Sequence, residues 1–319
     1  MKSEVNKIRA VALAAALGAG ATANAADIII GVPNWTSVKA TAHVLEVVIE
    51  DNLGLDVELQ TSTNPIVFEA MDSGAMHAHP EVWMPNQQNL HDTFVKNKGT
   101  VVMNPNGVAG DQYMCVPKYI AEKHGITSID DLTNPSVAAL FDSNGNGRGE
   151  IFIGTPGWAS TNIEKIRAKS YGYDQTFDLI EKDETLAYAD LANAINAKEP
   201  WVGFCYTPHH MFVLHDLHVL TEPPHDESKW KTVQPTDDPA WLDKSSAGVA
   251  WPTAYLHVHY AKSLEKSHPQ VASLFSKVKL NTDAVSQMTY ALAVDKKDAS
   301  AYAKEWVGAN EDLVLSWLQ

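Results

Sequence analysis

Five aromatic residues share one setting in this sequence. Each follows an apolar run and lies within two residues of a proline: Trp35, Trp83, Trp158, Trp251 and Tyr206. An aromatic face is apolar and also attracts a cation through its ring quadrupole. A single Trp beside a Pro would be expected to pack beneath a loop. The repeated arrangement instead predicts that several rings line one site for an organic cation.

Alternating strands and helices are predicted to position these rings. The apolar run Asp27–Val32 predicts a strand, and helical spacing from Thr36 to Gly54 predicts a helix. A half-exposed strand over 57–60 and a helix from Pro65 to Gly74 follow, and a third strand leads into Trp83. This β-α-β-α-β order is typical of a parallel sheet with flanking helices.

The pattern restarts twice further along the chain. Later strands are predicted at 112–116, 151–154, 201–206 and 254–259, with helices from Thr161, from Leu186 and towards the C-terminus. Two modules with a late return strand predict an α/β protein of two lobes, residues 26–109 with 252–319 and residues 110–251. The chain would cross between the lobes twice. Ligands of open α/β sheets bind at the carboxyl ends of the strands, so we expect the site there.

Residues 1–25 have the features of a cleaved signal peptide. Basic residues precede the apolar run Ala10–Ala16, and Ala23-Asn24-Ala25 has the small-x-small form of a cleavage site. The apolar run is too short for a membrane span, and no later stretch reaches the required length. We therefore expect export to a bacterial periplasm.

Charge and motifs argue against several classes of function. The chain has 24 Lys and Arg against 39 Asp and Glu, a formal net charge of −15, which disfavours nucleic acid and anionic membrane surfaces as partners. The sequence lacks the Gly-x-Ser-x-Gly, His-Glu-x-x-His, Walker and Gly-x-Gly-x-x-Gly motifs. Glu81 and Asp111 lie near the predicted cleft without a recognisable catalytic partner. A binding protein is predicted rather than an enzyme.

Four motifs carry a resemblance to a known family: VWMPNQ, LFDSNGNGRGEI, PGWAS and YTPHHMF, in this order. They resemble the glycine betaine/proline betaine substrate-binding proteins of ABC transporters, over nearly all of the chain after residue 25. The resemblance implies a type II periplasmic-binding-protein fold with two hinge crossings. It also implies that the lobes close on a methylated onium ligand in an aromatic box and deliver it to the permease subunits of an ABC importer. A monomer is expected.

The resemblance assigns most of the aromatic residues to the box. Trp83 and Trp158 fall on box positions, and Tyr206 falls where many members carry Trp. Trp35 matches an aromatic residue of the choline-binding branch, which pairs it with an Asp two residues later. Here that position is Ser37, which counts against choline.

Other residues are predicted to hold the opposite end of the ligand. In some members a His four residues after the first box Trp contacts the ligand carboxylate, and here Gln87 stands there as a donor. Ala159 and Ser160 lie where a helix should begin, and free N–H groups at a helix start form an anion site. A zwitterion would thus place its cation in the box and its carboxylate at this helix. Tyr113 and Trp251 complete the predicted lining.

The loop before Trp158 matches the first half of a calcium-binding loop. Oxygen-bearing side chains occur at alternate positions and a glycine follows. The predicted ligands are Asp142, Asn144, Asn146, the carbonyl of Arg148, and Glu150. The Glu expected at the twelfth position is missing, since Ile153 stands there. We predict a structural Ca²⁺ that fixes the strand before Trp158; the alternative is a plain polar turn. No catalytic cofactor is expected.

Histidines suggest an alternative of another class, a periplasmic zinc-binding protein. His77 and His79 alternate along one predicted strand and His257 and His259 along another, while four more lie between residues 209 and 218. No His-rich loop or Cys/His finger spacing accompanies them. This pattern favours surface or core histidines over a zinc site.

Two further questions stay open at the level of sequence. Cys115 and Cys205 could pair in an oxidising compartment, but their apolar, strand-like surroundings suit buried thiols equally well. The ligand is also open: glycine betaine, proline betaine, trimethylamine N-oxide, choline, carnitine and dimethylsulfoniopropionate all present a methylated onium head. They differ at the other end, where carboxylate, hydroxyl or N-oxide oxygen needs different partners.

Overall fold

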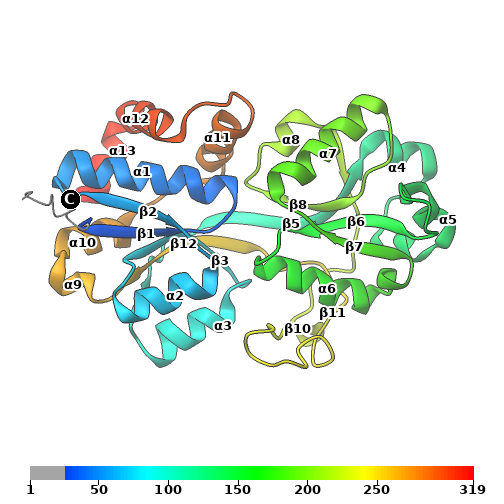
Figure 1. The fold of residues 1–319 in the computed structure, drawn as a ribbon, viewed down its shortest axis with the longest axis horizontal. Helices are drawn as coiled ribbons and strands as arrows, with labels where there is room; N and C mark the ends of the chain where they lie inside the picture. Colours follow the sequence, from blue (N-terminus) through cyan, green and yellow to red (C-terminus); the bar gives the residue numbers. More distant parts are fainter. Residues whose placement is uncertain (1–25) are drawn as a thin grey trace, which may run out of the picture.

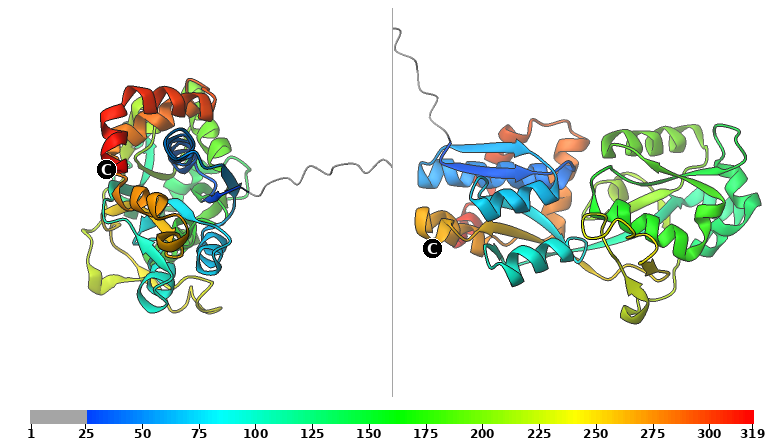
Figure 2. Two further views of the ribbon diagram at one scale, coloured as in Figure 1. Left: turned by 90° about the vertical axis from the view of Figure 1, so that its left-hand side faces the viewer. Right: turned by 60° about the horizontal axis from the view of Figure 1, so that its bottom comes forward.

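The structure is a computed structural model and describes residues 26–319. The predicted signal peptide, residues 1–25, lies outside the described residues. The chain forms two α/β lobes that lie side by side (Figure 1), and they are also separate in the right-hand view of Figure 2. Within residues 26–319, none of the helices combines the length and the apolar character that a membrane span requires.

The sheet of lobe 1 has the strand order β2-β1-β3-β12. Strand β1 (Ile28–Val32) pairs in parallel with β2 (Val57–Thr61) and β3 (Ala78–Met84). Strand β12 (Ala254–Ala261) runs antiparallel to β3, and the short β4 (Val101–Met103) pairs with β12. The first three strands are the predicted parallel module, and the fourth returns from the end of the chain.

Helices cover both faces of this sheet (Figure 1). Helix α1 (Thr36–Leu53) lies on one face, with α11 (Thr282–Ala293) and α12 (Ala299–Ala309) packed on it. Helix α2 (Asn64–Ser73) lies on the other face. Helix α1 has the predicted extent and stops at Gly54 in the left-handed region. The remaining α-helices of lobe 1 in the described residues are α3 (Gln88–His91), which continues as a π-helix (Asp92–Asn97), α9 (Leu264–Ser267), α10 (Pro269–Lys277) and α13 (Glu311–Leu318).

Lobe 2 repeats the same plan. Strand β6 (Gly149–Gly154) pairs in parallel with β7 (Phe177–Glu181) and β8 (Gly203–Thr207). Strand β5 (Val108–Pro117) runs antiparallel to β8, and β9 (Leu217–Val219) pairs with β5. Each lobe is therefore a parallel β-α-β-α-β module extended by an antiparallel strand. This confirms the predicted two-lobed α/β fold class.

The two main helices of lobe 2 begin slightly earlier than predicted. Helix α6 (Ala159–Tyr171) starts two residues before Thr161. Helix α7 (Glu184–Ala197) starts before the predicted Leu186, because the Asp183 carboxylate accepts a hydrogen bond from Thr185 N–H and caps the helix. The other elements are α4 (Lys118–His124), α5 (Pro135–Ala138), α8 (Met211–Leu214), β10 (Trp230–Lys231) and β11 (Ser246–Ala247).

Strand β5 connects the two lobes. Its residues 108–110 pair with β12 of lobe 1, and its residues 111–115 pair with β8 of lobe 2. The pairing partner thus changes at Gly110, where a side chain would collide with the Thr207 carbonyl and press on the Trp83 ring. The second crossing leads from lobe 2 into β12. The observed change of partner lies beside the predicted lobe boundary at 109/110.

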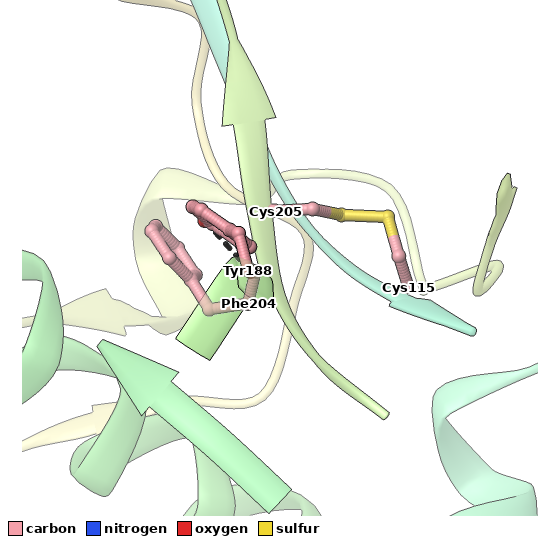
Figure 3. Close-up of a disulfide and its surroundings, with 4 residues drawn as sticks. All are labelled: Cys115, Tyr188, Phe204 and Cys205. Atoms are coloured by element: carbon pink, nitrogen blue, oxygen red, sulfur yellow. Dashed lines mark hydrogen bonds between the residues drawn. A yellow bond between two sulfur atoms is a disulfide. The ribbon is translucent and has the colours of Figure 1, made fainter. Parts of the chain in front are cut away.

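A disulfide joins Cys115 of β5 to Cys205 of β8 (Figure 3). The Cα atoms are 6.0 Å apart, within the range that a disulfide spans. Both residues are fully buried, and the neighbouring Tyr188 hydroxyl donates to the Phe204 carbonyl at 3.2 Å. Of the two alternatives that the sequence allowed, the structure has the bridge. It covalently ties the connecting strand to the sheet of lobe 2.

Candidate ligand-binding site

Four of the predicted aromatic residues meet at the cleft between the lobes. Trp35 follows β1 and Trp83 lies in β3, so both belong to lobe 1. Trp158 follows β6 and Tyr206 lies near the end of β8, so both belong to lobe 2. All four line one cavity at the carboxyl ends of the parallel strands, where the strand order predicted a site.

The rings stand nearly at right angles to one another. The centroids of Trp83 and Tyr206 are 5.4 Å apart at 90°, those of Trp158 and Tyr206 are 6.0 Å apart at 83°, and those of Trp35 and Trp158 are 6.2 Å apart at 89°. Edge-to-face pairs of this kind stabilise each other and hold the rings in fixed orientations. Together the rings line a cavity that is partly open to solvent.

The polar part of the cavity consists of uncharged amides and one hydroxyl. The predicted Gln87, Ala159 and Ser160 are among the lining residues, and Asn64, Asn86 and Gln112 were not predicted. The Asn86 and Gln112 amides exchange hydrogen bonds of 2.6 and 3.1 Å and so satisfy each other. Among residues 26–319, no acidic or basic side chain lines the cavity directly.

A buried carboxylate, Glu81, lies behind the two Trp residues of lobe 1. Its Oε1 accepts hydrogen bonds from the indole N–H groups of Trp35 at 3.0 Å and Trp83 at 3.2 Å, and from the Ser37 hydroxyl at 2.5 Å. Burial raises the pKa of the Glu81 carboxyl to about 7, although these hydrogen bonds lower it. Ser37, which replaces an Asp of the choline-binding branch, therefore contacts a carboxylate supplied by β3.

A second buried carboxylate, Glu184, lies behind the Tyr206 ring. It accepts hydrogen bonds from the Tyr206 hydroxyl and, at 3.0 Å each, from the N–H and hydroxyl of Thr36 across the cleft. His209 Nε2 lies 3.3 Å away. Burial alone would raise the pKa of Glu184, but its contacts with His209, Tyr206 and Thr36 outweigh burial and hold this pKa below its usual value.

These two carboxylates make the box favourable for a cation. Each accepts a hydrogen bond from the polar edge of a ring whose face lines the cavity, so negative charge lies just outside an apolar surface. In a buried site of low dielectric constant, such charges act over several ångströms. A cation at the ring faces would gain both the ring quadrupoles and this field without stripping a carboxylate of its hydrogen bonds.

The start of α6 provides a site for an anion beside the rings. Trp158 is the N-cap residue, and its side chain does not cap the helix; its indole N–H donates instead to the Asn34 carbonyl of lobe 1 at 3.0 Å. The first N–H groups of the helix, from Ala159 onwards, are thereby left for another acceptor, and Ala159 and Ser160 line the cavity. Gly154, at the end of β6, has a φ of 128°, which strains any other residue.

Comparisons with known proteins agree with this architecture. Residues 26–309 match the family described as the substrate binding domain of ABC-type glycine betaine transport systems. The chain belongs to this family. The glycine betaine/proline betaine-binding periplasmic protein of Salmonella typhimurium is 23% identical over 250 residues, which are 73% of this chain and 72% of that protein.

Solved structures show the same fold. Lactococcal OpuAC, closed and complexed with glycine betaine, superposes with a TM-score of 0.69 at 20% identity, covering 92% of this chain and 99% of that one. An ABC-transporter choline-binding protein in complex with choline gives a TM-score of 0.71 at 16% identity, covering 91% of each chain. The predicted family and fold are thus confirmed, and these two relatives hold different ligands on one scaffold.

The structure places Trp251 outside the box, contrary to prediction. Its ring packs against Trp230 at 5.1 Å, and its indole N–H donates to Glu164 at 2.6 Å. It also covers the buried guanidinium of Arg167 at 5.6 Å. Trp251 satisfies the rule of a Trp beside a Pro after an apolar run, but this polar cluster of lobe 2 occupies its ring and its N–H.

Tyr113 is likewise absent from the cavity lining. It lies on β5 next to Gln112, and successive side chains of a strand point to opposite faces. Because Gln112 faces the cavity, Tyr113 faces away and packs against Phe212 at 6.4 Å. Burial and the nearby Asp111 raise the pKa of Tyr113 to about 12, so its hydroxyl stays neutral.

The predicted calcium loop is closed by its own hydrogen bonds. The Asp142 carboxylate accepts from the N–H groups of residues 145, 146 and 147, and the Asn144 amide contacts Glu150. The Arg148 side chain turns to Asp178 at 2.5 Å. A Ca²⁺ would have to displace several of these N–H donors. Calcium binding stays a prediction, which melting curves with and without chelator would test.

The histidines do not assemble a zinc site in the described part of the chain. No group of three or more His, Cys, Asp or Glu side chains there is arranged to hold a metal. His79 and His259 are fully buried, and burial lowers the pKa of His79 to about 3. These residues are neutral members of the core of lobe 1, and the family match favours the other hypothesis.

Sequence reasoning missed several polar residues of the site: Asn64, Glu81, Asn86, Gln112 and Glu184. Asn64 and Glu184 begin helices, where polar residues are common caps, so their types gave no signal. Glu81 was placed near the cleft but without a partner. The one usable clue was its alternation with Trp83 and His79, which puts the three side chains on one face of a strand.

Proposed function

We propose that this chain is a periplasmic solute-binding protein that captures a small methylated onium compound and delivers it to an ABC importer without altering it chemically. The ligand belongs to the glycine betaine and proline betaine class. The observation that carries the proposal is a cavity lined by aromatic residues of both lobes and otherwise by uncharged residues; the aromatic residues are Trp35 and Trp83 of lobe 1 and Trp158, Phe204 and Tyr206 of lobe 2. Such a cavity binds a cation with little desolvation of protein charges.

The contacts across the cleft support capture by lobe closure. The Trp158 indole bonds to the Asn34 carbonyl, the Asn34 amide donates to Asp183 at 2.9 Å, and Glu184 accepts from Thr36. Each bond joins the start of α1 in lobe 1 to lobe 2. A ligand between the rings would be enclosed only when these bonds form, so binding and closure would stabilise each other.

The location and the partner are supported by the relatives. The Salmonella protein is named as periplasmic, and the family is part of a transport system. We propose the same compartment here, with the permease subunits of an importer as partner and a monomeric chain in solution. Osmotic-shock fractionation and uptake by cells with and without the gene would test compartment and transport.

Isothermal titration calorimetry tests the binding function. Heat with glycine betaine or another onium compound, and none with zinc, is expected; zinc binding without onium binding would replace this function with the metal-binding alternative. NMR of the recovered ligand should show it unchanged. A panel that adds trimethylamine N-oxide, choline, carnitine and dimethylsulfoniopropionate, followed by intrinsic Trp fluorescence, would identify the preferred member.

A further inference from the structure

Two helices from opposite lobes begin at the same cavity. Helix α6 of lobe 2 begins at Ala159, and helix α2 of lobe 1 begins at Asn64. The two starts lie close together, because a Cβ placed on Gly157 would lie 4.0 Å from the methyl carbon of Thr63, the N-cap of α2. Neither N-cap side chain caps its helix. Two positive helix ends are therefore directed at one region of the cleft.

The side chain of Asn64 is a polar group without a full set of partners at this place. It is 3% exposed and lines the cavity. Its Oδ1 accepts a hydrogen bond from His79 Nε2 at 2.8 Å. Among residues 26–319, its Nδ2 makes no hydrogen bond. The amide therefore presents two free N–H donors at a buried position, where a lost hydrogen bond is costly.

His79 fixes which way this amide points. The Glu81 backbone N–H donates to His79 Nδ1 at 3.1 Å, so Nδ1 must be the unprotonated nitrogen and Nε2 must carry the proton. Since Nε2–H can only donate, the Asn64 atom opposite it must be the carbonyl oxygen. The Glu81 N–H, the His79 imidazole and the Asn64 carbonyl oxygen are thus linked in one series of hydrogen bonds. The Asn64 amide therefore presents only its N–H donors to the cavity.

Gln87 provides a further unpaired hydrogen-bond donor at the cavity. It is 5% exposed, lines the cavity, and its side-chain amide has no hydrogen-bond partner within the described residues. In contrast, Asn86 and Gln112 satisfy each other. The unpaired donors thus lie at the two helix starts and at Gln87, and no basic side chain competes with them. An oxygen that only accepts hydrogen bonds would satisfy them.

We infer that Asn64, oriented by His79, donates to the oxygen end of the ligand, which is bound between the starts of α2 and α6. This inference rests on the proposed function and narrows it. The site selects onium compounds that end in an acceptor-only oxygen, a carboxylate or an N-oxide, over choline, whose hydroxyl must also place a proton. Because α2 and α6 belong to different lobes, the same oxygen would hold the cleft closed.

The test measures calorimetric affinities of wild type and two variants for four probes: glycine betaine, trimethylamine N-oxide, choline and tetramethylammonium, which has no oxygen. Asn64→Asp retains an acceptor for His79 but loses the donors, and Asn64→Leu loses them without adding charge. In both, affinity for glycine betaine and trimethylamine N-oxide should fall roughly 10- to 100-fold, as for a lost charge-assisted hydrogen bond. Choline should lose less, and tetramethylammonium should stay within about twofold in Asn64→Leu.

The outcomes separate this inference from the function on which it rests. Wild type that binds none of the four probes would overturn the proposed function. Wild type that binds, with Asn64→Leu weakening all four equally or none of them, would overturn the role of Asn64. Whichever of glycine betaine and trimethylamine N-oxide loses more identifies the oxygen that the site prefers.

His79 is a positioning residue, and its variants give an independent check. In His79→Leu the amide can turn over, so the preference for glycine betaine over tetramethylammonium should shrink. His79→Gln can still donate to Asn64 and should restore that preference. Equal preferences in both variants would contradict the orientation argument, since a purely structural role would lower the melting temperature without changing the ratio.

Discussion

The molecule contains two aromatic cages for a cation, and only one of them is filled by the chain itself. In lobe 2, the Arg167 guanidinium lies 5.4 to 5.9 Å from the rings of Tyr171, Trp230 and Trp251. At the cleft, the rings of the box surround a cavity instead. Both cages include a buried carboxylate that accepts an indole N–H, Glu164 in lobe 2 and Glu81 at the cleft.

The difference between the cages lies in where the carboxylates stand. Glu164 and Glu222 contact Arg167 directly, with Nε of Arg167 2.9 Å from Glu164. Burial alone would lower the pKa of Arg167, but these carboxylates outweigh it and raise it, so the cation is permanent. At the cleft the carboxylates lie behind the rings and bond to them. A cage whose carboxylates contact the cation directly is a structural ion cluster. A cage whose carboxylates contact only the polar edges of the rings can release its cation.

The largest effect expected concerns the filled cage. Arg167→Met would leave Glu164 and Glu222 buried without their cation, which should cost about 3–5 kcal/mol of unfolding free energy. Denaturant unfolding measures this loss. Lys165→Met on the same helix removes a partly exposed ion pair with Glu181 and should cost no more than about 1 kcal/mol. Equal losses in the two variants would show that the Arg167 cluster is not the structural element described.

The second prediction contrasts the Trp residues of the two cages. Trp83→Ala and Trp158→Ala should each weaken onium binding roughly tenfold or more, because a desolvated cation–π contact contributes about 2 kcal/mol. Substitution by Phe should cost less, since a ring face remains. Calorimetry is the measurement, because fluorescence changes with the Trp content.

Trp251→Ala is the matched control for these variants. It should lower stability, by about 3–5 kcal/mol for a buried Trp, and leave the affinity of the folded protein near that of wild type. If Trp83→Ala and Trp158→Ala bind as tightly as wild type, the aromatic box is wrong. If Trp251→Ala loses affinity as they do, the distinction between the cages is wrong.

Trp251 also shows how far the sequence could lead. The rule of an aromatic residue beside a Pro at the end of an apolar run predicted five rings at one site, and four of them line the cleft cavity, because strand ends in such a sheet converge on one edge. The rule failed for Trp251, since nothing local reveals that Glu164 and Arg167, more than 80 residues away, take its ring and N–H. Trp306 and Trp317, which lie in α12 and α13, are buried and stack at 6.3 Å.

Other parts of the site depend on contacts that no local pattern encodes. Strand alternation could have separated Gln112 from Tyr113, but only the pairing with β8 shows which of them faces the cavity. The hydrogen bond from Thr36 to Glu184 joins residues 148 positions apart and exists only because the lobes meet. The fold could be predicted from the periodicity and the order of the elements. The polar contacts of the site could not, because they form only in the tertiary structure.

The third prediction uses the titration of Glu81 at the cleft. With a pKa of about 7 without ligand, Glu81 is increasingly ionised as pH rises. A cation at the Trp35 and Trp83 rings favours the ionised form and lowers this pKa, so binding releases protons. Affinity for glycine betaine should therefore rise between pH 5.5 and 8, by about tenfold if the pKa falls by one unit.

Glu81→Gln is the control for this pH dependence. The Gln side chain cannot ionise, so affinity should vary little over the same range, and calorimetry in buffers of different ionisation enthalpy would show no proton release. The folding stability of the ligand-free protein should depend on pH in the opposite direction. The ligand-free fold holds the Glu81 proton more tightly than the unfolded chain does, so its stability should fall as pH rises from about 4.5 to 7. An unchanged pH profile in Glu81→Gln would assign the effect to another group.

The smallest effect is expected for Tyr206→Phe, which tests whether the box uses the ring or the hydroxyl. The hydroxyl donates to Glu184 behind the ring, and the ring edge stays packed against Trp83 and Trp158. Without the hydroxyl, Glu184 keeps its two hydrogen bonds from Thr36 and loses only one donor. We expect affinity to fall less than about threefold and stability to fall by about 1 kcal/mol.

Tyr188→Phe is the matched control for this variant, because it removes a buried hydroxyl of lobe 2 that donates to the Phe204 carbonyl outside the box. Its cost in stability should be similar and its effect on affinity negligible. A loss of tenfold or more in Tyr206→Phe alone would place the hydroxyl in contact with the ligand. The cleft cage would then resemble the filled cage, because a polar group as well as the ring faces would contact the bound ligand.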